Sequence, residues 1–279
     1  MKILGISASQ RKWGNTDILI QHVLRGAEGQ GAETRFLRLT DFDLRQCKGC
    51  LSCILKDRDC VIEDELPEVL EPFRWADGVV LGSPIYLLCA TGSIQQMTPR
   101  FFGKIYNREF EGKPGLSLVV GGMSGWETFA LPQVSLFFLL LGMPIVDQFV
   151  AYGQGPGEIF YDEKACHRAR ESGEALARGD TAYRGEAGTC PVCHFHMVAT
   201  SPDGSAHCTL CDLPGTWVEK EETMRFEPLP GAEHRWTSDH MRHHFEEVVL
   251  GSVPTFRSKI KEIQQKLEVF RREEHGLTG

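Results

Sequence analysis

The sequence lacks any block of basic residues. Lysine and arginine number 30 against 38 aspartates and glutamates, and the 279-residue chain has a formal net charge of −8. Such a charge, without a basic cluster, indicates that neither nucleic acid nor an anionic membrane is the main partner. Hydrophobic residues make up 42% and charged residues 24%, which is typical of a soluble globular protein. The length allows one large domain or one domain with an appendage.

A long hydrophobic run is also missing. The most apolar stretch, SLFFLLLGMPIV at residues 135–146, is too short to cross a bilayer. Residues 1–9 are mostly apolar but short, and Arg11 and Lys12 interrupt the run, which does not fit a secretory signal. We therefore expect a cytoplasmic protein without a membrane partner, in which thiols stay reduced. In that compartment ten cysteines indicate metal or redox chemistry rather than a disulfide framework.

Strand-like and helix-like patterns alternate through the first 178 residues. Short apolar runs, such as GVVLG at 78–82, are followed by longer segments whose apolar residues recur every three or four positions. This alternation predicts an α/β fold of flavodoxin type, with a doubly wound, five-stranded parallel sheet that binds its ligand at the carboxyl ends of the strands. We expect strands at residues 2–7, 33–39, 78–82, 116–120 and 144–152, and helices at 17–28 (capped by Asn15 or Thr16), 64–75, 94–106, 129–141 and 163–178.

The pattern changes after residue 178. Residues 219–236 are charged and contain two prolines, so we expect extended or irregular chain there. A helical segment follows, broken near Gly251 and Pro254, and its apolar stripe would pack on the main domain or on another subunit. The expected parts are a flavodoxin-like domain at 1–178, a ribbon-like module at 187–218 and C-terminal helices at 236–275, whose stripe is Ile260, Ile263, Leu267 and Phe270.

Three loops at consecutive strand ends carry the strongest ligand signal. The first, SASQRKWGNT at residues 7–16, brings hydroxyls, an amide and two cations to the start of a helix, where the dipole and free N–H groups favour a phosphate. It is not a Walker A loop, and a polar loop with a helix cap is the alternative. The loops GSPIY at 82–86 and GGMSGW at 121–126 allow backbone to approach a flat ligand and supply aromatic rings to cover it, or they are ordinary turns.

These loops resemble those of the NADPH-dependent FMN reductase family of the flavodoxin-like superfamily. SQRKWGNT resembles the family's S-P-R-x-x-G-N-T phosphate loop, and GSPIY and GGMSG resemble its flavin loops; the resemblance extends over residues 1–178. It implies a phosphate site of FMN formed by Ser9, Arg11, Asn15 and Thr16, with Pro84, Ile85 and Tyr86 along the flavin and Gly121, Gly122 and Gly125 near its ring.

The first group of cysteines, CKGCLSCILKDRDC at residues 47–60, has the spacing C-x2-C-x2-C-x6-C. Four thiolates so close in sequence can surround an iron–sulfur cluster, and x2 spacings recur in cluster-binding loops. A zinc ion, a disulfide or buried unliganded thiols are the alternatives. The motif resembles that of the iron–sulfur flavoproteins, which implies a [4Fe–4S] cluster held by Cys47, Cys50, Cys53 and Cys60.

The second group of cysteines forms the pattern C-x2-C-x14-C-x2-C. Two such knuckles predict a tetrahedral site of zinc-ribbon type, with rubredoxin-type iron as the alternative. Residues 186–222 carry six acidic residues and one lysine, a net charge of −5 that does not suit nucleic acid. The expected ligands are Cys190, Cys193, Cys208 and Cys211, and His194, His196 and His207 are expected not to bind the metal.

These features together predict an FMN-dependent oxidoreductase with an iron–sulfur cluster. A flavin exchanges two electrons and a cluster one, so the pair can connect different redox partners. The resemblance implies ferredoxin or NAD(P)H as donor and a homo-oligomer. The alternatives are an NAD(P)H-dependent flavin or quinone reductase without a cluster, and a non-enzymatic redox sensor or scaffold. No side chain stands out as a nucleophile or general acid, so no catalytic residue is assigned beyond the cofactor ligands.

Overall fold

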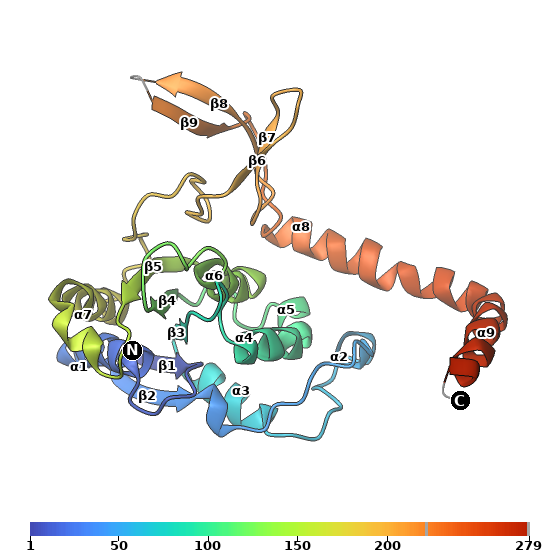
Figure 1. Ribbon diagram of the computed structural model, residues 1–279, viewed down its shortest axis with the longest axis horizontal. Coiled ribbons are helices and arrows are strands. Elements are labelled where there is room, and N and C mark those ends of the chain that lie inside the picture. The colour runs from blue at the N-terminus through green and yellow to red at the C-terminus, as the bar shows by residue number, and fades with distance from the viewer. Residues whose placement is uncertain (221–222, 278–279) are drawn as a thin grey trace. The chain divides into compact units, whose positions relative to one another are not determined.

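The computed structural model describes residues 1–220 and 223–277, and their side chains as far as residue 271 (Figure 1). Residues 1–236 and residues 237–279 form two structural units. The first unit contains the main sheet and the second group of cysteines, and the second unit is helical in its described part.

A five-stranded parallel sheet lies at the centre of the first unit, in the order β2-β1-β3-β4-β5. The winding reverses between β1 and β3, and this reversal leaves a crevice at the carboxyl ends of the strands where such folds bind ligands. The doubly wound parallel sheet predicted from the sequence is confirmed. The strands are β1 (Lys2–Ser7), β2 (Glu33–Arg38), β3 (Gly78–Pro84), β4 (Gly115–Gly121) and β5 (Ile145–Tyr152).

Helices α1 (Asn15–Gly29) and α7 (Glu163–Ala177) pack together on one face of the sheet (Figure 1). Their close approach depends on glycine. A Cβ atom on Gly26 would lie 2.0 Å from the carbonyl oxygen of Arg170, and one on Gly173 would lie 1.9 Å from that of Val23. A larger residue at either position would push the two helices apart.

The opposite face is covered by α3 (Leu66–Trp75), α6 (Ala130–Leu140) and two short helices between them in sequence. A cluster of phenylalanines fills the space under these helices. The ring centroid of Phe101 lies 5.1 Å from that of Phe73 and 5.1 Å from that of Phe137, at the inclined angles that aromatic pairs prefer.

The single helix predicted for residues 94–106 is wrong. The chain instead forms α4 (Gly92–Met97), a 3₁₀ turn (Thr98–Phe101) and α5 (Phe102–Tyr106). Pro99 explains the interruption, because proline has no N–H to donate and its ring disfavours the interior of an α-helix. The short helix α2 (Ser52–Leu55) lies within the first group of cysteines.

A second, antiparallel sheet has the order β6-β7-β8-β9, and we call residues 187–228 the ribbon. The sequence predicts extended or irregular chain after residue 219. Part of this segment is a regular strand, because β9 pairs with β8 as far as Pro228. Phe226 on β9 packs against Trp217 on β8, with ring centroids 6.1 Å apart. The proline stands at the end of an edge strand, where its missing N–H is tolerated. The strands are β6 (Val198–Thr200), β7 (Ala206–Cys208), β8 (Pro214–Lys220) and β9 (Thr223–Pro228).

The second unit consists of α8 (Ser238–His243), a π-helical turn (His244–Leu250) and α9 (Ser252–Leu277). The break expected near Gly251 is present, but Pro254 does not interrupt the helix. It lies in the first turn of α9, where proline costs no hydrogen bond. None of the helices in the described residues has the length and apolar character needed to cross a membrane.

Candidate functional site

A cavity of 170 Å³ lies where the central strands end, and we call it the strand-end cavity. The loop that follows β5 contributes Gly153, Gln154 and Pro156 to its lining, and sequence analysis missed these three residues. Gly125 lies in the loop after β4 but does not line the cavity. The other nine residues assigned to FMN from the sequence do line it: Ser9, Arg11, Asn15, Thr16, Pro84, Ile85, Tyr86, Gly121 and Gly122.

The loop between β1 and α1 is folded so that an anion fits at the helix start. The Ser9 hydroxyl accepts the N–H of Arg11 at 3.1 Å, and the N–H of Gly14 donates to the Arg11 carbonyl at 3.0 Å. Gly14, not Asn15 or Thr16, occupies the cap position, so the predicted cap is wrong. Because the first N–H groups of a helix have no partner within it, they are free to bind a phosphate.

Asn15 uses its side chain to hold a neighbouring loop. Its amide nitrogen donates to the carbonyl oxygens of Gly153 at 2.9 Å and Gly155 at 3.0 Å, and its Oδ1 accepts the N–H of Gly157 at 2.8 Å. This tertiary bonding explains why Asn15 does not cap its own helix. It fixes the loop after β5 as one wall of the strand-end cavity.

A buried ion pair between Asp17 and Arg38 holds the loop between β1 and α1 in place. The Ser7 hydroxyl donates to Asp17 at 2.5 Å, and Arg38 donates to the carbonyl oxygens of Ser9 at 2.9 Å and Arg11 at 3.1 Å. These bonds occupy the carbonyl oxygens of Ser9 and Arg11 with a cation, which suits a loop that binds an anionic ligand. Sequence reasoning missed both charged residues, because nothing in their spacing shows that the end of β2 meets the first turn of α1.

The loop after β3 forms a tight turn beside the cavity. Tyr86 and Cys89 exchange two backbone hydrogen bonds of 2.8 Å and 3.0 Å, and the central residues Leu87 and Leu88 have φ values of 49° and 73°. Leucine rarely adopts this left-handed conformation, so the turn is strained. It leaves the Leu87 side chain 83% exposed.

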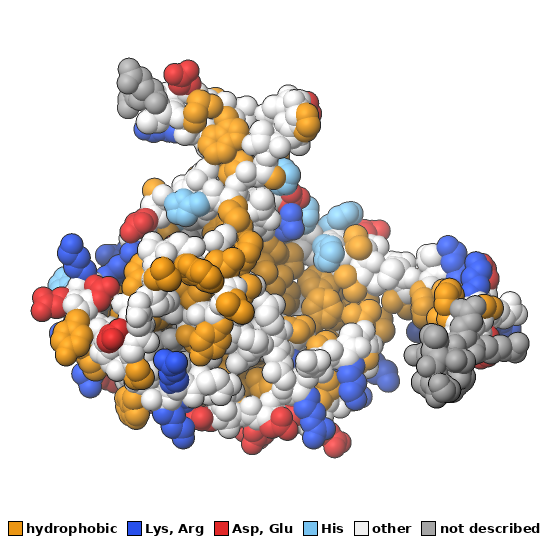
Figure 2. All heavy atoms as spheres, viewed as in Figure 1, with side chains coloured by type: hydrophobic (Ala, Val, Ile, Leu, Met, Phe, Trp, Pro, Cys, Tyr) orange, Lys and Arg blue, Asp and Glu red, His pale blue; other side chains and the backbone are white. Residues whose placement is uncertain are grey.

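Exposed apolar side chains surround this edge of the sheet, and we call Tyr86, Leu87, Met123 and Trp126 the apolar collar. Figure 2 shows hydrophobic side chains gathered over the loops that follow β3 and β4. Residues 84–91 and 121–126 contain no charged residue. The arrangement fits a flat ligand with a phosphate at α1 and an uncharged ring at the collar, which is the shape of FMN.

The four thiols of the cysteine loop, residues 47–60, influence one another electrostatically. Burial raises the pKa of Cys53, and negative charge on Cys60, Cys47 and Cys50 raises it further. In the described part of the chain, only the ribbon cysteines bring three or more candidate ligand atoms within 4.8 Å of one another. The cysteine loop therefore lacks the tight spacing of a single-ion site, and a four-iron cluster holds its sulfur ligands farther apart than one ion does.

Backbone and hydroxyl donors point at the sulfurs of the cysteine loop. The N–H of Gly49 donates to Cys47 Sγ at 3.4 Å. Hydrogen bonds from the backbone N–H and then the hydroxyl of Ser52 lower the pKa of Cys50. Donors to sulfur stabilise thiolates and tune the potential of a cluster. The loop thus fits an iron–sulfur cluster in its donor chemistry.

Arg100 links the two ends of the cysteine loop. Its guanidinium forms an ion pair with Asp64, and both side chains are inaccessible to solvent. It also donates to the carbonyl oxygen of Arg45 and hydrogen-bonds to Cys60. Arg45 precedes the loop and Asp64 follows it, so one side chain ties both ends together. Sequence analysis missed this residue, since it lies 36 positions from its partner.

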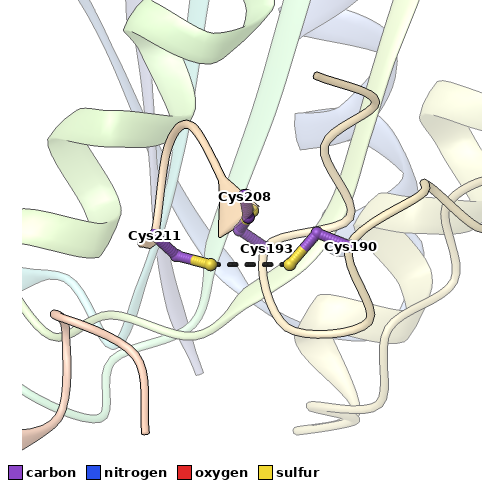
Figure 3. Close-up of side chains that lie close together, drawn as sticks. All are labelled: Cys190, Cys193, Cys208 and Cys211. Atoms are coloured by element: carbon purple, nitrogen blue, oxygen red, sulfur yellow. Dashed lines mark hydrogen bonds between the residues drawn. The ribbon is translucent and has the colours of Figure 1, made fainter. Parts of the chain in front are cut away.

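The four ribbon cysteines form the most compact thiol group (Figure 3). Cys190 Sγ lies 3.5 Å from Cys211 Sγ, Cys193 Sγ lies 3.5 Å from Cys208 Sγ, and all four residues are buried. A tetrahedral zinc site with bonds of about 2.3 Å requires sulfur atoms to be roughly 3.8 Å apart. The arrangement predicted from the two knuckles is present, and it fits zinc or a single iron.

A family model described as NADPH-dependent FMN reductase matches residues 1–157. The chain belongs to the NADPH-dependent FMN reductase family. An iron–sulfur flavoprotein of Methanocaldococcus jannaschii is 31% identical over 186 residues, which cover 63% of this chain and 96% of that protein. The similarity to this family predicted from the three loops and the cysteine spacing is confirmed.

Two further proteins match this chain beyond the flavodoxin-like domain. A flavone synthase of Aspergillus candidus is 26% identical over 257 residues, which cover 77% of each chain. The solved structure of a flavone reductase superposes with a TM-score of 0.80 at 22% identity and covers 97% of both chains. The second likeness shows that the whole fold, ribbon included, occurs in another protein.

Membership of the FMN reductase family makes the chain a flavin-dependent oxidoreductase. When bound, FMN supplies hydride and single-electron transfer. The protein's own residues would bind the phosphate at Gly14 and α1, orient the ring between the loops after β3 and β4, and shield it with the apolar collar. Family membership also implies a redox partner such as NAD(P)H or ferredoxin.

Proposed function

We propose that the chain is an FMN-dependent oxidoreductase of the iron–sulfur flavoprotein type. In this proposal Cys47, Cys50, Cys53 and Cys60 hold a [4Fe–4S] cluster, and electrons pass between it, FMN in the strand-end cavity, and NAD(P)H or ferredoxin. The observation that carries the proposal is the cysteine loop itself. Cys47 and Cys50 accept hydrogen bonds, Arg100 joins the two ends of the loop and reaches Cys60, and the four sulfurs are not packed for a single ion.

The proposal is tested by anaerobic purification, with iron, sulfide, zinc and FMN measured per chain. We expect about four iron atoms in the cysteine loop and one zinc in the ribbon. Reduction should produce an electron paramagnetic resonance signal. Cys50→Ser should lose iron and keep FMN, while the control Cys166→Ser, outside both cysteine groups, should keep both. Protein that binds FMN but no iron would support the alternative, a flavin or quinone reductase without a cluster.

A second candidate function is oxidation or reduction of a carbon–carbon double bond in a flavone-like molecule. The support is the flavone synthase relative, whose match extends past the flavodoxin-like domain, together with the uncharged apolar collar. The test is anaerobic turnover of FMN-loaded protein with NADPH and a flavone, followed by mass spectrometry. A product two hydrogen atoms heavier supports this function. NADPH oxidation only when ferredoxin is supplied would favour the first candidate.

Several finer expectations accompany these proposals. We propose zinc as the ribbon metal, a cytoplasmic location, and a homo-oligomer. We also propose three functional parts at residues 1–178, 187–218 and 236–275. The ribbon then serves a structural or docking role, because its acidic composition does not suit nucleic acid.

A further inference from the structure

A second and larger cavity lies between the ribbon and the main sheet, and we call it the ribbon cavity. Its volume is 440 Å³, within the range that small-molecule sites occupy. The end of β5 and the start of α6 form one side, and residues 194–197, which follow the first ribbon knuckle, form the other. Leu131 and Phe149 line it from the sheet domain, and Phe195 and Met197 line it from the ribbon.

A stacked pair of rings forms part of the wall of the ribbon cavity. Tyr183 and His194 lie with their ring centroids 3.4 Å apart and their planes inclined by 7°. Burial raises the pKa of Tyr183 to about 12, so its hydroxyl is neutral at physiological pH. That hydroxyl is already used, since it donates to the carbonyl oxygen of Glu186 at 3.0 Å. The pair therefore offers a rigid flat surface.

One polar atom in the lining has no partner. Glu127 Oε2 is buried and forms no hydrogen bond within the described residues. A buried carboxylate oxygen without a donor costs free energy, which a donor on a bound molecule would recover. Tyr152 lies beside this carboxylate. Burial raises the pKa of Tyr152, as do the negative charge of Glu127 and a hydrogen bond to its side chain, while a hydrogen bond from Ser124 lowers it. The unpartnered Oε2 is therefore the position left for a donor on a bound molecule.

The charges around the ribbon cavity disfavour anionic ligands. The Arg168 guanidinium is engaged by Asp147, at 2.8 Å, and covers the ring of Phe149, at 4.6 Å from its centroid. An anionic ligand would find no unpaired cation there and would face the Glu127 carboxylate. The aromatic and aliphatic side chains of the lining favour an apolar body, so an uncharged molecule with one hydrogen-bond donor suits the cavity.

We propose that the ribbon cavity binds a planar, uncharged aromatic molecule with a hydroxyl group that donates to Glu127. The flat body would lie between the apolar side chains of the sheet domain and those of the ribbon knuckle. Tyr152, at the end of β5, is the register partner of Gly121, which lines the strand-end cavity. The ligand would therefore lie one loop away from the flavin site, and the ribbon would act as a wall of a ligand site.

The experiment is calorimetric titration of FMN-loaded, metal-loaded full chain with a hydroxyflavone and, separately, with the methyl ether of the same skeleton. No reductant is present, so binding is measured without turnover. We expect the hydroxyflavone to bind and Glu127→Gln to weaken it about tenfold, the difference between a charged and a neutral acceptor. The methyl ether should bind more weakly, and Glu127→Gln should not change its affinity.

Steric variants locate the binding. Leu131→Trp and Met197→Trp fill the cavity from opposite sides, and either should abolish binding of both molecules while FMN and metal contents stay unchanged. Met224→Trp, at an exposed position of β9 outside the lining of either cavity, is the control and should leave the affinity as it was. The proposal is overturned if the hydroxyflavone does not bind the loaded protein, if the filling variants bind it normally, or if Met224→Trp abolishes binding.

The result of this binding experiment can be distinguished from a failure of the proposed function. Protein that reduces an acceptor but fails to bind the hydroxyflavone overturns the ribbon cavity alone. Protein that binds it, with the stated response to Glu127→Gln, supports the cavity even where no turnover is detected.

Discussion

Gln148 on β5 donates its side-chain amide to the main-chain carbonyl of Cys193, 3.2 Å away. The same amide donates to the carbonyl of His194 at 3.1 Å, and the buried hydroxyl of Ser135 on α6 donates to the Gln148 side-chain oxygen at 2.8 Å. A metal-site knuckle is thereby bonded to the sheet that ends at the flavin site. Gln148 is 5% exposed, so these bonds are shielded from water.

Replacing Gln148 with methionine keeps the side-chain length and removes these bonds. We expect Gln148→Met to lower the free energy of unfolding by about 1–3 kcal/mol, because buried carbonyls lose their donor. The linker before the ribbon should also be cleaved earlier in limited proteolysis. Gln30→Met, at an exposed position, is the matched control. Equal stability and equal cleavage of the two variants would show that the contact with the ribbon is not maintained in solution.

Arg100 offers a test of the cysteine loop that changes no cysteine. Lysine keeps the charge but cannot reach Asp64, Cys60 and the Arg45 carbonyl together. We expect Arg100→Lys to lose most of its iron and to retain its FMN, as measured by metal analysis and flavin absorbance. Arg58→Lys, exposed in the same loop, should keep both. Normal iron content in Arg100→Lys would show that Arg100 is not needed to hold the cluster.

The Asp64 carboxyl makes stability depend on pH. Burial alone would raise its pKa, but hydrogen bonds from Arg100 and from the N–H groups of Arg45 and Leu66 hold it below the ordinary 3.8. A lowered folded-state pKa contributes stability that is present above pH 3.8 and is lost as the pH falls through the folded value. Chemical unfolding of metal-free protein between pH 6 and pH 2 should show this loss in the wild type. The slope should be smaller in Asp64→Asn.

The turn at Leu87 and Leu88 should be improved by residues that favour positive φ. Asparagine followed by glycine is the preferred pair at the centre of a two-residue hairpin of this kind. We expect the double variant Leu87→Asn, Leu88→Gly to raise the free energy of unfolding by about 2 kcal/mol, since each of the two strained residues costs of order 1 kcal/mol. It should also raise KM for an apolar acceptor, because the exposed Leu87 side chain is lost. An unchanged KM would indicate that Leu87 does not contact the acceptor.

The sheet and both groups of cysteines could be predicted because their signals are local. The continuous apolar run GVVLG reflects a strand buried on both faces, and the apolar periodicity of α1 reflects a helix buried on one face. The spacing of Cys190 and Cys193 is that of a metal-binding knuckle. The pairs of Asp17 with Arg38 and Asp64 with Arg100 join residues 21 and 36 positions apart. Such pairs exist only once the fold is formed, and their spacing carries no signal in the sequence.

Removal of the ribbon metal should affect the ribbon without affecting the flavin site. The ribbon has a small core made largely of its own cysteines with Phe195, Leu213 and Phe226. Small modules of this kind take much of their folding free energy from the metal. We expect Cys208→Ser to lose zinc, to make the ribbon more sensitive to proteases, and to keep its FMN, because none of the described ribbon residues lines the strand-end cavity. The same variant should lose binding of the hydroxyflavone, since Phe195 and Met197 form one side of the ribbon cavity.

The control for this prediction is Cys166→Ser, whose thiol lies on α7 outside both cysteine groups. Loss of FMN from Cys208→Ser, but not from Cys166→Ser, would mean that the ribbon supports the flavin site directly.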